Sequence, residues 1–323
     1  MDNFHNDLSI LDFVLKKGTR FEPRSFNSLD QFWDFFNAGS ENWEDPFDLA
    51  VYGGLISDRV AYAFVSGYES AIRRLFPDTP RRSIASFCVT EKGGTHPKNI
   101  SCRLDKKESD GSGGNEWTIN GAKRFITCAR ESELYYVLVS CGTDDSGKNI
   151  LKFVRINRDL PGISMTLMSG LPFVPEVSHG EIAFTDVAID QSQILPYDGY
   201  AAYAKPFRTV EDIYVLSALF AYLFGMSSAY CWPKGTMQKI LKILFCLKKL
   251  AAHDPLDKVA HIVLGSLLDD VQEFLDEISP LWGTVPEESR NLWERDRPLF
   301  SVAEAARRRR LDIAWASYEE NGG

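Results

Sequence analysis

The spacing of apolar residues divides the chain into three regions. In the first 82 residues the pattern is helical, because residues 29–36 and 56–72 repeat apolar side chains at intervals of three and four. A Gly-Gly pair at residues 53–54 predicts a break before the second of these helices. We therefore expect an N-terminal helical domain over residues 1–82.

The second region, residues 83–195, has the short apolar runs that are typical of β-strands. The dipeptide Asn120-Gly121 lies between two of these runs and favours a type I′ turn, so we expect a hairpin there. Residues 110–115 are rich in Gly and Ser and predict a further turn. Short strands separated by turns indicate an antiparallel sandwich or barrel. The expected strands cover residues 84–91, 101–107, 116–120, 122–127, 134–141, 150–157, 163–168 and 181–189.

Helical spacing returns in the third region, residues 196–323. Asp254-Pro255 has the form of a helix start, with Asp as the N-cap and Pro at the first helical position. The helix that follows should end at Pro280, and a last helix should cover residues 299–317. One apolar stripe predicts the core-facing side of the first helix: Leu256, Val259, Val263, Leu267, Val271, Phe274 and Ile278.

The order of these regions defines the fold class. Strands and helices do not alternate along the chain, which argues against an α/β fold with a parallel sheet. We expect an α+β protein with a helical domain over residues 1–82, a central β domain over residues 83–195 and a helical bundle over residues 196–323.

One apolar segment raises the question of a membrane. Residues 213–226 are uncharged, yet this stretch is shorter than a membrane-spanning helix requires. Glu211 and Asp212 at its start, in an acidic chain, favour the central helix of a bundle over a membrane span. A membrane-associated helical protein built around residues 213–232 stays as the weaker alternative.

Composition narrows the class of protein. Of 323 residues, 44% are hydrophobic and 12% aromatic, which excludes a disordered chain. The formal net charge of −9 argues against nucleic acid as a partner, because phosphate backbones repel an acidic protein. The six cysteines form no CxxC pair, so we expect no metal site and reduced thiols in a cytoplasmic protein. Asp2, Asp7 and Asp12 make the first 15 residues unlike a secretory signal.

Four segments resemble signatures of the acyl-CoA dehydrogenase family. Residues 88–95 (C-V-T-E-K-G-G-T) resemble C-V-T-E-P-G-A-G-S-D, and residues 116–127 (E-W-T-I-N-G-A-K-R-F-I-T) resemble E-W-x-I-N-G-x-K-x-W-I-T. Residues 159–163 resemble D-x-P-G-I/L, and residues 181–187 resemble the strand V-x-F-E-D-V. Because order and spacing also agree, the chain resembles a compact, divergent member of this family, well over residues 55–187 and weakly in the helical C-terminus.

The resemblance implies a flavoenzyme that acts on thioesters. In the family a carboxylate removes the α-proton of an acyl thioester, and the β-hydride passes to the N5 atom of a bound FAD. The implied partners are therefore acyl-CoA or an acyl-carrier thioester, together with an electron acceptor that the sequence does not identify. The family also implies a homodimer or a homotetramer.

The resemblance also implies which residues hold the cofactor. Thr90 and Thr127 match residues that hydrogen-bond the flavin ring. Phe125 matches a Trp that covers the ring, and Thr95 matches a Ser that contacts the pyrophosphate. A threonine alone would more often be an ordinary strand residue, but within matched motifs the cofactor interpretation is favoured. The predicted FAD-binding residues are Cys88, Val89, Thr90, Thr95, Phe125, Ile126 and Thr127.

The candidate catalytic base is Glu304. Residues 292–296 (L-W-E-R-D) resemble the family's R-D segment, and counting forward without a gap aligns Glu304 with the family's catalytic Glu. Alanines beside it could leave it partly desolvated and raise its pKa. The equally weighted alternative is an exposed Glu that pairs along the helix with Arg307 and Arg308. The run Arg307–Arg310 is interpreted as a solvated helix end, with a phosphate clamp as the less favoured alternative.

Two family motifs are missing from the C-terminal half. The R-x-x-F-G motif does not follow Tyr230, and the G-G-x-G-Y/F loop does not precede the R-D segment. In the family the first motif brings an Arg to the FAD of a neighbouring subunit. Two hypotheses follow: a dehydrogenase that holds FAD in its own way, or a catalytically silent relative that serves as a partner or scaffold for another protein.

Overall fold

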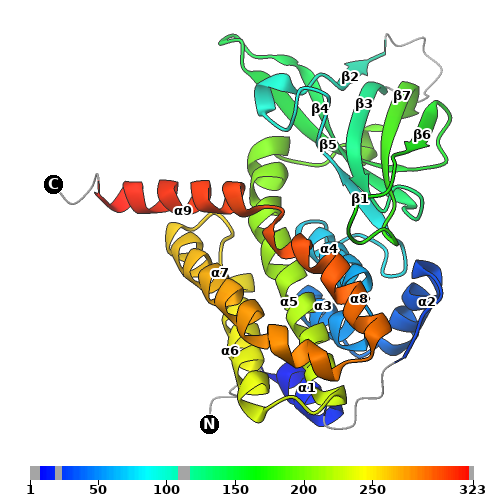
Figure 1. Cartoon of the computed structure of the whole chain (residues 1–323). Helices are drawn as coiled ribbons and strands as arrows, with labels where there is room; N and C mark the ends of the chain where they lie inside the picture. Colours follow the sequence, from blue (N-terminus) through cyan, green and yellow to red (C-terminus); the bar gives the residue numbers. More distant parts are fainter. Residues whose placement is uncertain (1–7, 19–23, 108–116, 320–323) are drawn as a thin grey trace, which may run out of the picture. The chain divides into compact units, whose positions relative to one another are not determined.

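The computed structural model describes residues 8–18, 24–107 and 117–319 (Figure 1). Glu116 and the turn expected at residues 110–115 lie outside the described residues. The chain divides into two compact units, a helical unit (Met1–Arg74, Pro172–Glu176 and Thr209–Gly323) and a β unit (Leu75–Leu171 and Val177–Arg208). The division of the chain at residues 82 and 195 stays a prediction. The α+β class, with helices before and after the strands, is confirmed.

The helices share a simple order along the chain. Among the described residues, four helices precede the strands and five follow them. They are α1 (Ser9–Gly18), α2 (Leu29–Gly39), α3 (Pro46–Ile56), α4 (Val60–Leu75), α5 (Lys205–Ala229), α6 (Lys234–Ala251), α7 (Lys258–Ile278), α8 (Glu287–Asp296) and α9 (Glu304–Glu319).

Glycines bring α3 and α4 into close contact with α5. A Cβ added at Gly54 would lie 1.9 Å from the Ala218 carbonyl oxygen, and one at Gly67 would lie 2.5 Å from the Val215 Cα. Because only glycine permits this approach, Gly54 belongs inside α3. The break predicted at the Gly-Gly pair is therefore wrong, and α3 continues to Ile56.

The apolar segment at residues 213–226 lies inside α5, as the bundle interpretation requires. A helix from Tyr200 to Ala229 is long and apolar enough to cross a membrane by length and composition. However, 89% of its most apolar window is buried inside the protein, which is the pattern of a core helix.

Two details of α7 differ from expectation. Its N-cap is Asp257, whose carboxylate accepts the Ala260 amide at 2.9 Å, whereas Asp254 caps a preceding turn. The helix thus begins three residues later than the Asp-Pro signal predicted, because both aspartates can cap and the second is followed by the continuous helical stretch. Val259 and Val263 are exposed, and the buried face of this part of α7 is formed by Ala260 and Leu264 instead.

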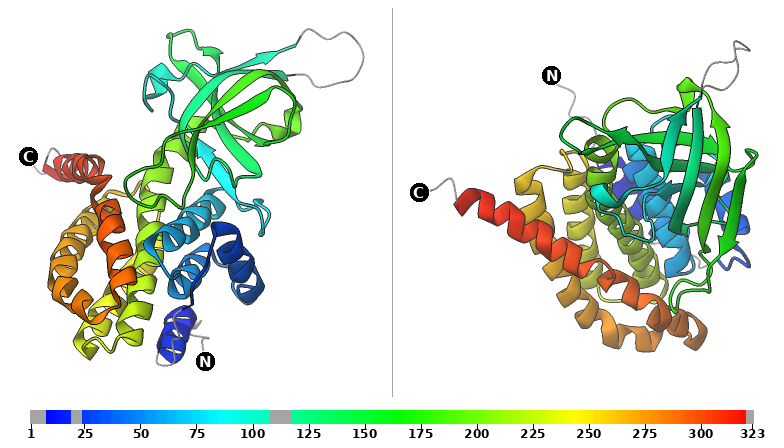
Figure 2. Two further views of the ribbon diagram at one scale, coloured as in Figure 1. Left: turned by 45° about the vertical axis from the view of Figure 1, so that its right-hand side comes forward. Right: turned by 90° about the horizontal axis from the view of Figure 1, so that it is seen from above.

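In the described part of the chain, seven strands form one sheet in the order β1-β4-β2-β3-β7-β6, with β5 paired to β4. Figure 2 shows this sheet strongly curved. The sheet is mixed, because β1 and β2 both run parallel to β4, whereas the sequence predicted an antiparallel arrangement. Parallel strands need a long connection, and the chain between β1 and β4 and between β2 and β4 is long enough to provide it. The strands are β1 (Ala85–Cys88), β2 (Arg103–Lys106), β3 (Trp117–Thr127), β4 (Leu134–Thr143), β5 (Asn149–Asn157), β6 (Ile163–Leu167) and β7 (His179–Ile189).

The hairpin predicted at Asn120-Gly121 is wrong, because β3 runs straight through it and pairs with β7 along its length. Gly121 has a φ of 143°, and the pairing register shifts between Ile119 and Gly121. A Cβ at Gly121 would come within 2.6 Å of the Cys102 Cα. The glycine therefore marks a bulge where two backbones approach, not a turn.

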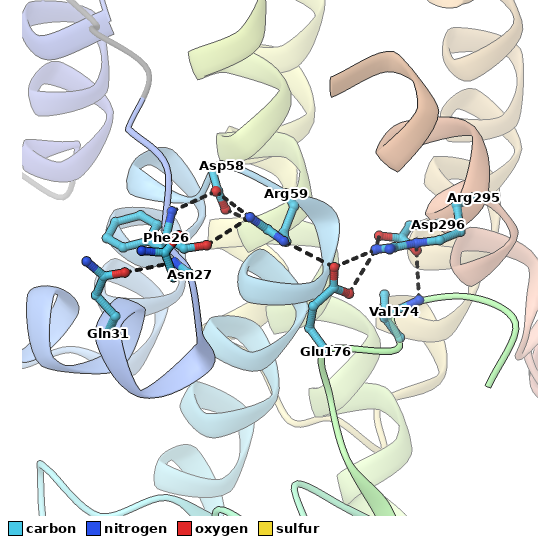
Figure 3. A network of polar contacts seen from close by, with 9 residues as sticks. All are labelled: Phe26, Asn27, Gln31, Asp58, Arg59, Val174, Glu176, Arg295 and Asp296. Carbon is cyan, nitrogen blue, oxygen red and sulfur yellow. Dashed lines mark hydrogen bonds and ion pairs between the residues drawn. The ribbon is translucent and has the colours of Figure 1, made fainter. Parts of the chain in front are cut away.

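A charged network in the helical unit holds residues 172–176, which lie between β6 and β7 in the chain (Figure 3). Glu176 accepts hydrogen bonds from Arg59 at 3.2 Å and from Arg295 at 2.8 Å. Asp296, fully buried, accepts the Val174 amide at 2.7 Å, and Val174 has a left-handed φ of 43°. This Glu176 network is the anchor of the segment in the helical unit.

Candidate functional site

Three contacts hold β1 and the segment after it alongside the end of β3, within the β unit. The Ser86 hydroxyl donates to the Thr127 carbonyl at 2.6 Å. The Arg124 amide donates to the Thr90 carbonyl at 2.8 Å. A Lys123–Glu91 ion pair at 2.6 Å closes the series. The structure therefore brings together two stretches that the sequence assigned to one cofactor site, residues 88–90 and 125–127.

The Lys123–Glu91 pair is sealed from water. Lys123 is 0% exposed, and its ammonium also donates to the Val89 carbonyl at 3.3 Å. Glu91 accepts further hydrogen bonds from the Ser101 amide at 2.8 Å, the Ser101 hydroxyl at 2.6 Å and the Cys102 amide at 3.1 Å. Burial alone would raise the pKa of Glu91, but the Lys123 charge and these hydrogen bonds hold that pKa below its usual value.

The predicted FAD-binding residues differ in what their side chains can reach. Cys88 and Ile126 are fully buried and Val89 nearly so, and Cys88 and Ile126 belong to the sheet's apolar core. Their side chains cannot meet a ligand, so only their backbone could do so. Thr90 and Thr127 are half-buried. We call these two residues the hydroxyl edge, because each is a partly accessible threonine whose backbone carbonyl accepts a hydrogen bond, Thr90 from Arg124 and Thr127 from Ser86.

Phe125 has an unusual conformation. It is 53% exposed and has a left-handed φ of 55°, at the point where the β3–β7 register shifts between Lys123 and Ile126. The Arg124 guanidinium lies 5.6 Å from the centre of its ring. A bulky residue held in this backbone region is strained, and such strain is concentrated at functional sites. The conformation turns the ring outward, which is what covering a flat ligand would require.

The structure adds one residue that the sequence did not single out, His179. It lies directly opposite Thr127 in the β3–β7 pairing, so both side chains are on one face of the sheet. Its Nδ1 lies 3.1 Å from the Val177 carbonyl oxygen. A carbonyl only accepts, so Nδ1 carries the proton and Nε2 is an acceptor in the neutral ring. Burial lowers the pKa of His179 and favours that neutral form. Only the strand register could have revealed this residue.

Thr95 follows a tight turn at residues 91–94. The Glu91 and Gly94 backbones bond in both directions, at 3.1 and 2.9 Å, and Gly94 has a φ of 92°. The Thr95 hydroxyl then accepts a hydrogen bond from the Arg208 guanidinium at 2.6 Å. Thr95 therefore follows Thr90 closely along the chain, and a cationic side chain lies beside its hydroxyl.

Glu304, the candidate base, belongs to the helical unit and is the first residue of α9. Its side chain is 68% exposed and lies 3.8 Å from Arg308, so the pairing at four residues is formed. Glu304 is therefore not desolvated, contrary to the first of the two interpretations of this residue. Glu304 borders a cavity of about 250 Å³ between α7 and α9, lined also by Gly265, Leu268, Asp269, Gln272, Phe300, Ser301, Arg307, Arg308 and Leu311.

The arginine run after Glu304 is not wholly solvated. Arg307 pairs with buried Asp212 at 2.8 Å, and Arg310 contacts the same carboxylate. These two arginines are three residues apart and thus share one face of α9. The expected Glu304–Arg307 pair is replaced by this contact. Half of the run therefore fastens α9 to α5, and the interpretation as a purely solvated helix end is wrong.

Nothing in the part of the chain that the structure describes gathers three or more metal-binding side chains. All six cysteines are free thiols, and three of them, Cys88, Cys102 and Cys128, are buried. Burial raises the pKa of Cys88 and raises that of Cys102 to about 11, so both are protonated at neutral pH.

Comparisons with known proteins find one family over the central strands. Residues 86–187 match the family described as acyl-CoA dehydrogenase, middle domain. Isobutyryl-CoA dehydrogenase from Dictyostelium discoideum is 30% identical over 102 residues, which make up 31% of this chain and 23% of that protein. The chain spans about a quarter to a third of the length of the curated relatives that it matches.

Solved structures match over nearly the whole chain. Butyryl-CoA dehydrogenase from Megasphaera elsdenii has a TM-score of 0.64 at 15% identity, covering 98% of this chain and 100% of that one. The FAD complex of PigA has a TM-score of 0.65 at 12% identity, covering 98% and 99%. At these identities the likeness shows the fold alone. The chain is thus acyl-CoA dehydrogenase-like: residues 86–187 match the middle domain of that family, and the whole chain has the fold of solved acyl-CoA dehydrogenases.

Proposed function

We propose that the protein binds FAD against the hydroxyl edge and dehydrogenates an acyl thioester between its α and β carbons. The observation that carries this proposal is the juxtaposition, within residues 86–187, of Thr90, Thr127 and the outward-turned Phe125. Threonine hydroxyls both donate and accept, so they can follow a ring whose hydrogen-bonding pattern changes on reduction. A solved neighbour with this fold is described as an FAD complex.

The residues present fit a flavin ring. The Thr90 and Thr127 hydroxyls are partly accessible, and the adjoining backbone is fixed by the Ser86 and Arg124 hydrogen bonds. FAD would supply the hydride acceptor, which no side chain provides. In this chain the task of Glu304 would be to accept the α-proton, and that of Thr90 and Thr127 to orient the ring. The cavity beside Glu304 offers Leu268, Phe300 and Leu311 as apolar lining for an acyl group.

A second candidate function rests on a specific observation about Glu304. Its side chain is exposed, paired with Arg308 and followed by Ala305 and Ala306, where the family has Gly-Thr. An exposed, charge-paired carboxylate lacks the desolvation that would tune it as a base. A catalytically silent flavin-fold protein, acting as a partner or scaffold, is therefore the alternative.

One experiment separates the two. The purified protein is loaded with FAD and an acyl-CoA is added without oxygen, while flavin absorbance is followed. Dehydrogenation predicts bleaching of the flavin band. Bound flavin that never bleaches with any chain length favours the silent relative, and a protein that stays colourless with excess FAD contradicts the flavin proposal itself.

The role of Glu304 is tested by Glu304→Gln, which should abolish bleaching while flavin stays bound, because an amide cannot accept the α-proton. Glu287→Gln is a matched control, since Glu287 is also an exposed Glu at the first position of a helix. Unchanged bleaching in Glu304→Gln would remove this residue from the mechanism.

We further propose a homodimer or homotetramer, with acyl-CoA or an acyl-carrier thioester as substrate. Sedimentation of the FAD-loaded protein tests the assembly, and a monomer at micromolar concentration would contradict it. The electron acceptor and the cytoplasmic location stay predictions from the sequence.

A further inference from the structure

Arg208 is an exposed arginine of the β unit. Its Nη2 donates to the Thr95 hydroxyl at 2.6 Å. Within the described ranges of the chain no carboxylate forms an ion pair with Arg208, although Arg124, in the same unit, pairs with Glu181 at 2.6 Å. A guanidinium has five N–H donors, and this contact uses one of them. The remaining donors are free to meet an anion.

The loop that carries Thr95 is basic. Residues 92–100 contain Lys92 and Lys98 and no Asp or Glu, in a chain whose formal net charge is −9. Glu91, the acid nearest to the loop, is neutralised by Lys123 at 2.6 Å. Lys92 and Lys98 are both exposed. These two lysines therefore give the loop a local positive charge, which favours a phosphate group over a neutral ligand.

The two side chains complement each other chemically. The Thr95 oxygen accepts from Arg208, so its own proton is free to donate. The planar guanidinium fork binds phosphate oxygens in pairs, which a lysine cannot do. Gly93 and Gly94 carry no side chain that would keep a ligand from the loop, since a Cβ at Gly94 would meet nothing within 4 Å.

We propose that Arg208 and Thr95 form a diphosphate-binding pair supplied by a single chain. Under the proposed function, on which this inference rests, the diphosphate is that of FAD or of coenzyme A. Arg208 would give the protein, within one chain, a cation for the cofactor, and the missing R-x-x-F-G motif would then be no obstacle to FAD binding. Arg208 is a binding residue in this account and takes no part in proton or hydride transfer.

The test measures equilibrium affinities of the full chain for FAD, riboflavin, coenzyme A and inorganic pyrophosphate. Riboflavin has the ring but no phosphate, so it separates ring contacts from diphosphate contacts. Arg208→Met should weaken FAD or coenzyme A, and pyrophosphate, about 10- to 100-fold, as expected for charge-assisted hydrogen bonds. Riboflavin affinity should not change. Arg208→Lys should recover only part of the loss, and Thr95→Val should lose less than Arg208→Met.

Arg103→Gln is the matched control, because Arg103 is an exposed cation on the same unit that pairs with Asp105 at 3.7 Å. If Arg208→Met loses affinity for FAD, the pair binds the FAD diphosphate. If it loses affinity for coenzyme A alone, the pair binds the diphosphate of the thioester carrier. Equal weakening of FAD and riboflavin, or no weakening of any phosphate ligand, would overturn the inference. If the protein binds no flavin yet binds pyrophosphate through Arg208, the proposed function fails while the diphosphate pair stands.

Discussion

Each unit of the molecule buries a carboxylate that fixes a loop, but the two do so in different ways. In the β unit, Glu91 meets one lysine that is 0% exposed, and three donors from Ser101 and Cys102 complete its shell. In the helical unit, Glu176 meets two arginines, and its side chain stays 18% exposed. The first is a sealed pair and the second is a shared, partly hydrated network.

The difference matches what each loop has to do. The Lys123–Glu91 pair sits next to the segment that carries the hydroxyl edge, and within residues 86–187, which match a family. Removing a charge from water is costly unless geometry is fixed, so a sealed pair fixes its loop closely. In the Glu176 network two arginines donate to one carboxylate, so the loss of one donor leaves the other in place. The site-bearing unit is therefore the one where single substitutions should do most harm.

The sharpest test of this comparison is Lys123→Met. It leaves Glu91 buried without its counter-charge, so the free energy of unfolding should fall by about 3–5 kcal/mol. Urea unfolding measures it. Adding Glu91→Leu to the same protein should restore part of the loss, because two apolar side chains leave no unpaired charge. An exposed pair, Arg103–Asp105, provides the control, and Arg103→Met should change stability by about 0–1 kcal/mol. Similar losses in both variants would contradict the idea of a sealed pair.

Glu176→Gln should lower the free energy of unfolding by less, about 1.5–3 kcal/mol, because it removes hydrogen bonds to a charged group. Burial would raise the pKa of Glu176, but hydrogen bonds from Arg295 and Arg59 outweigh it and lower that pKa. The stability from ionised Glu176 is therefore complete above the unfolded pKa of about 4.3 and is lost as the pH falls through the lower folded value.

Unfolding measured between pH 7 and pH 3 should accordingly show a weaker acid dependence in Glu176→Gln than in the wild type. Glu277→Gln removes an exposed carboxylate that pairs with Lys239 at 2.5 Å, and should leave the acid dependence nearly unchanged. An identical acid profile for Glu176→Gln and the wild type would show that the network contributes no such linkage.

The smallest expected effect is a gain in stability. Phe125→Asn places a residue that tolerates left-handed backbone where Phe is strained, so unfolding should cost about 1 kcal/mol more. Flavin affinity should fall at the same time, because the ring that covers the ligand is gone. Phe245→Asn, an exposed ring on α6, should give no gain. A Phe125→Asn protein that is less stable would contradict stored strain at the site.

The sequence predicted much of this molecule, and the errors have one common cause. Gly53-Gly54 and Asn120-Gly121 both indicated chain reversals, yet the structure uses Gly54 and Gly121 for close approach to Ala218 and Cys102. Nothing local distinguishes these uses of glycine, because the neighbour lies far away in the sequence. The predicted start of α7 was wrong for a local reason, because Asp254 and Asp257 can both act as an N-cap.

The candidate site divides in the same way. Motifs alone predicted that residues 88–90 and 125–127 belong together, and the hydrogen bonds of Ser86 and Arg124 join them. His179 could not be predicted, because only the register of β3 with β7 sets it opposite Thr127. Arg208 reaches Thr95 across 113 positions of the sequence, a distance at which helical or strand periodicity carries no information.

If the hydroxyl edge holds a flavin, FAD must bind the pure protein saturably, and titration with FAD measures this binding. We predict saturable binding with a shift of the flavin absorption band, and a clear loss of affinity in Thr127→Val, which keeps the shape and removes the hydroxyl. Absence of saturable binding, or equal affinity in the wild type and Thr127→Val, would contradict the account.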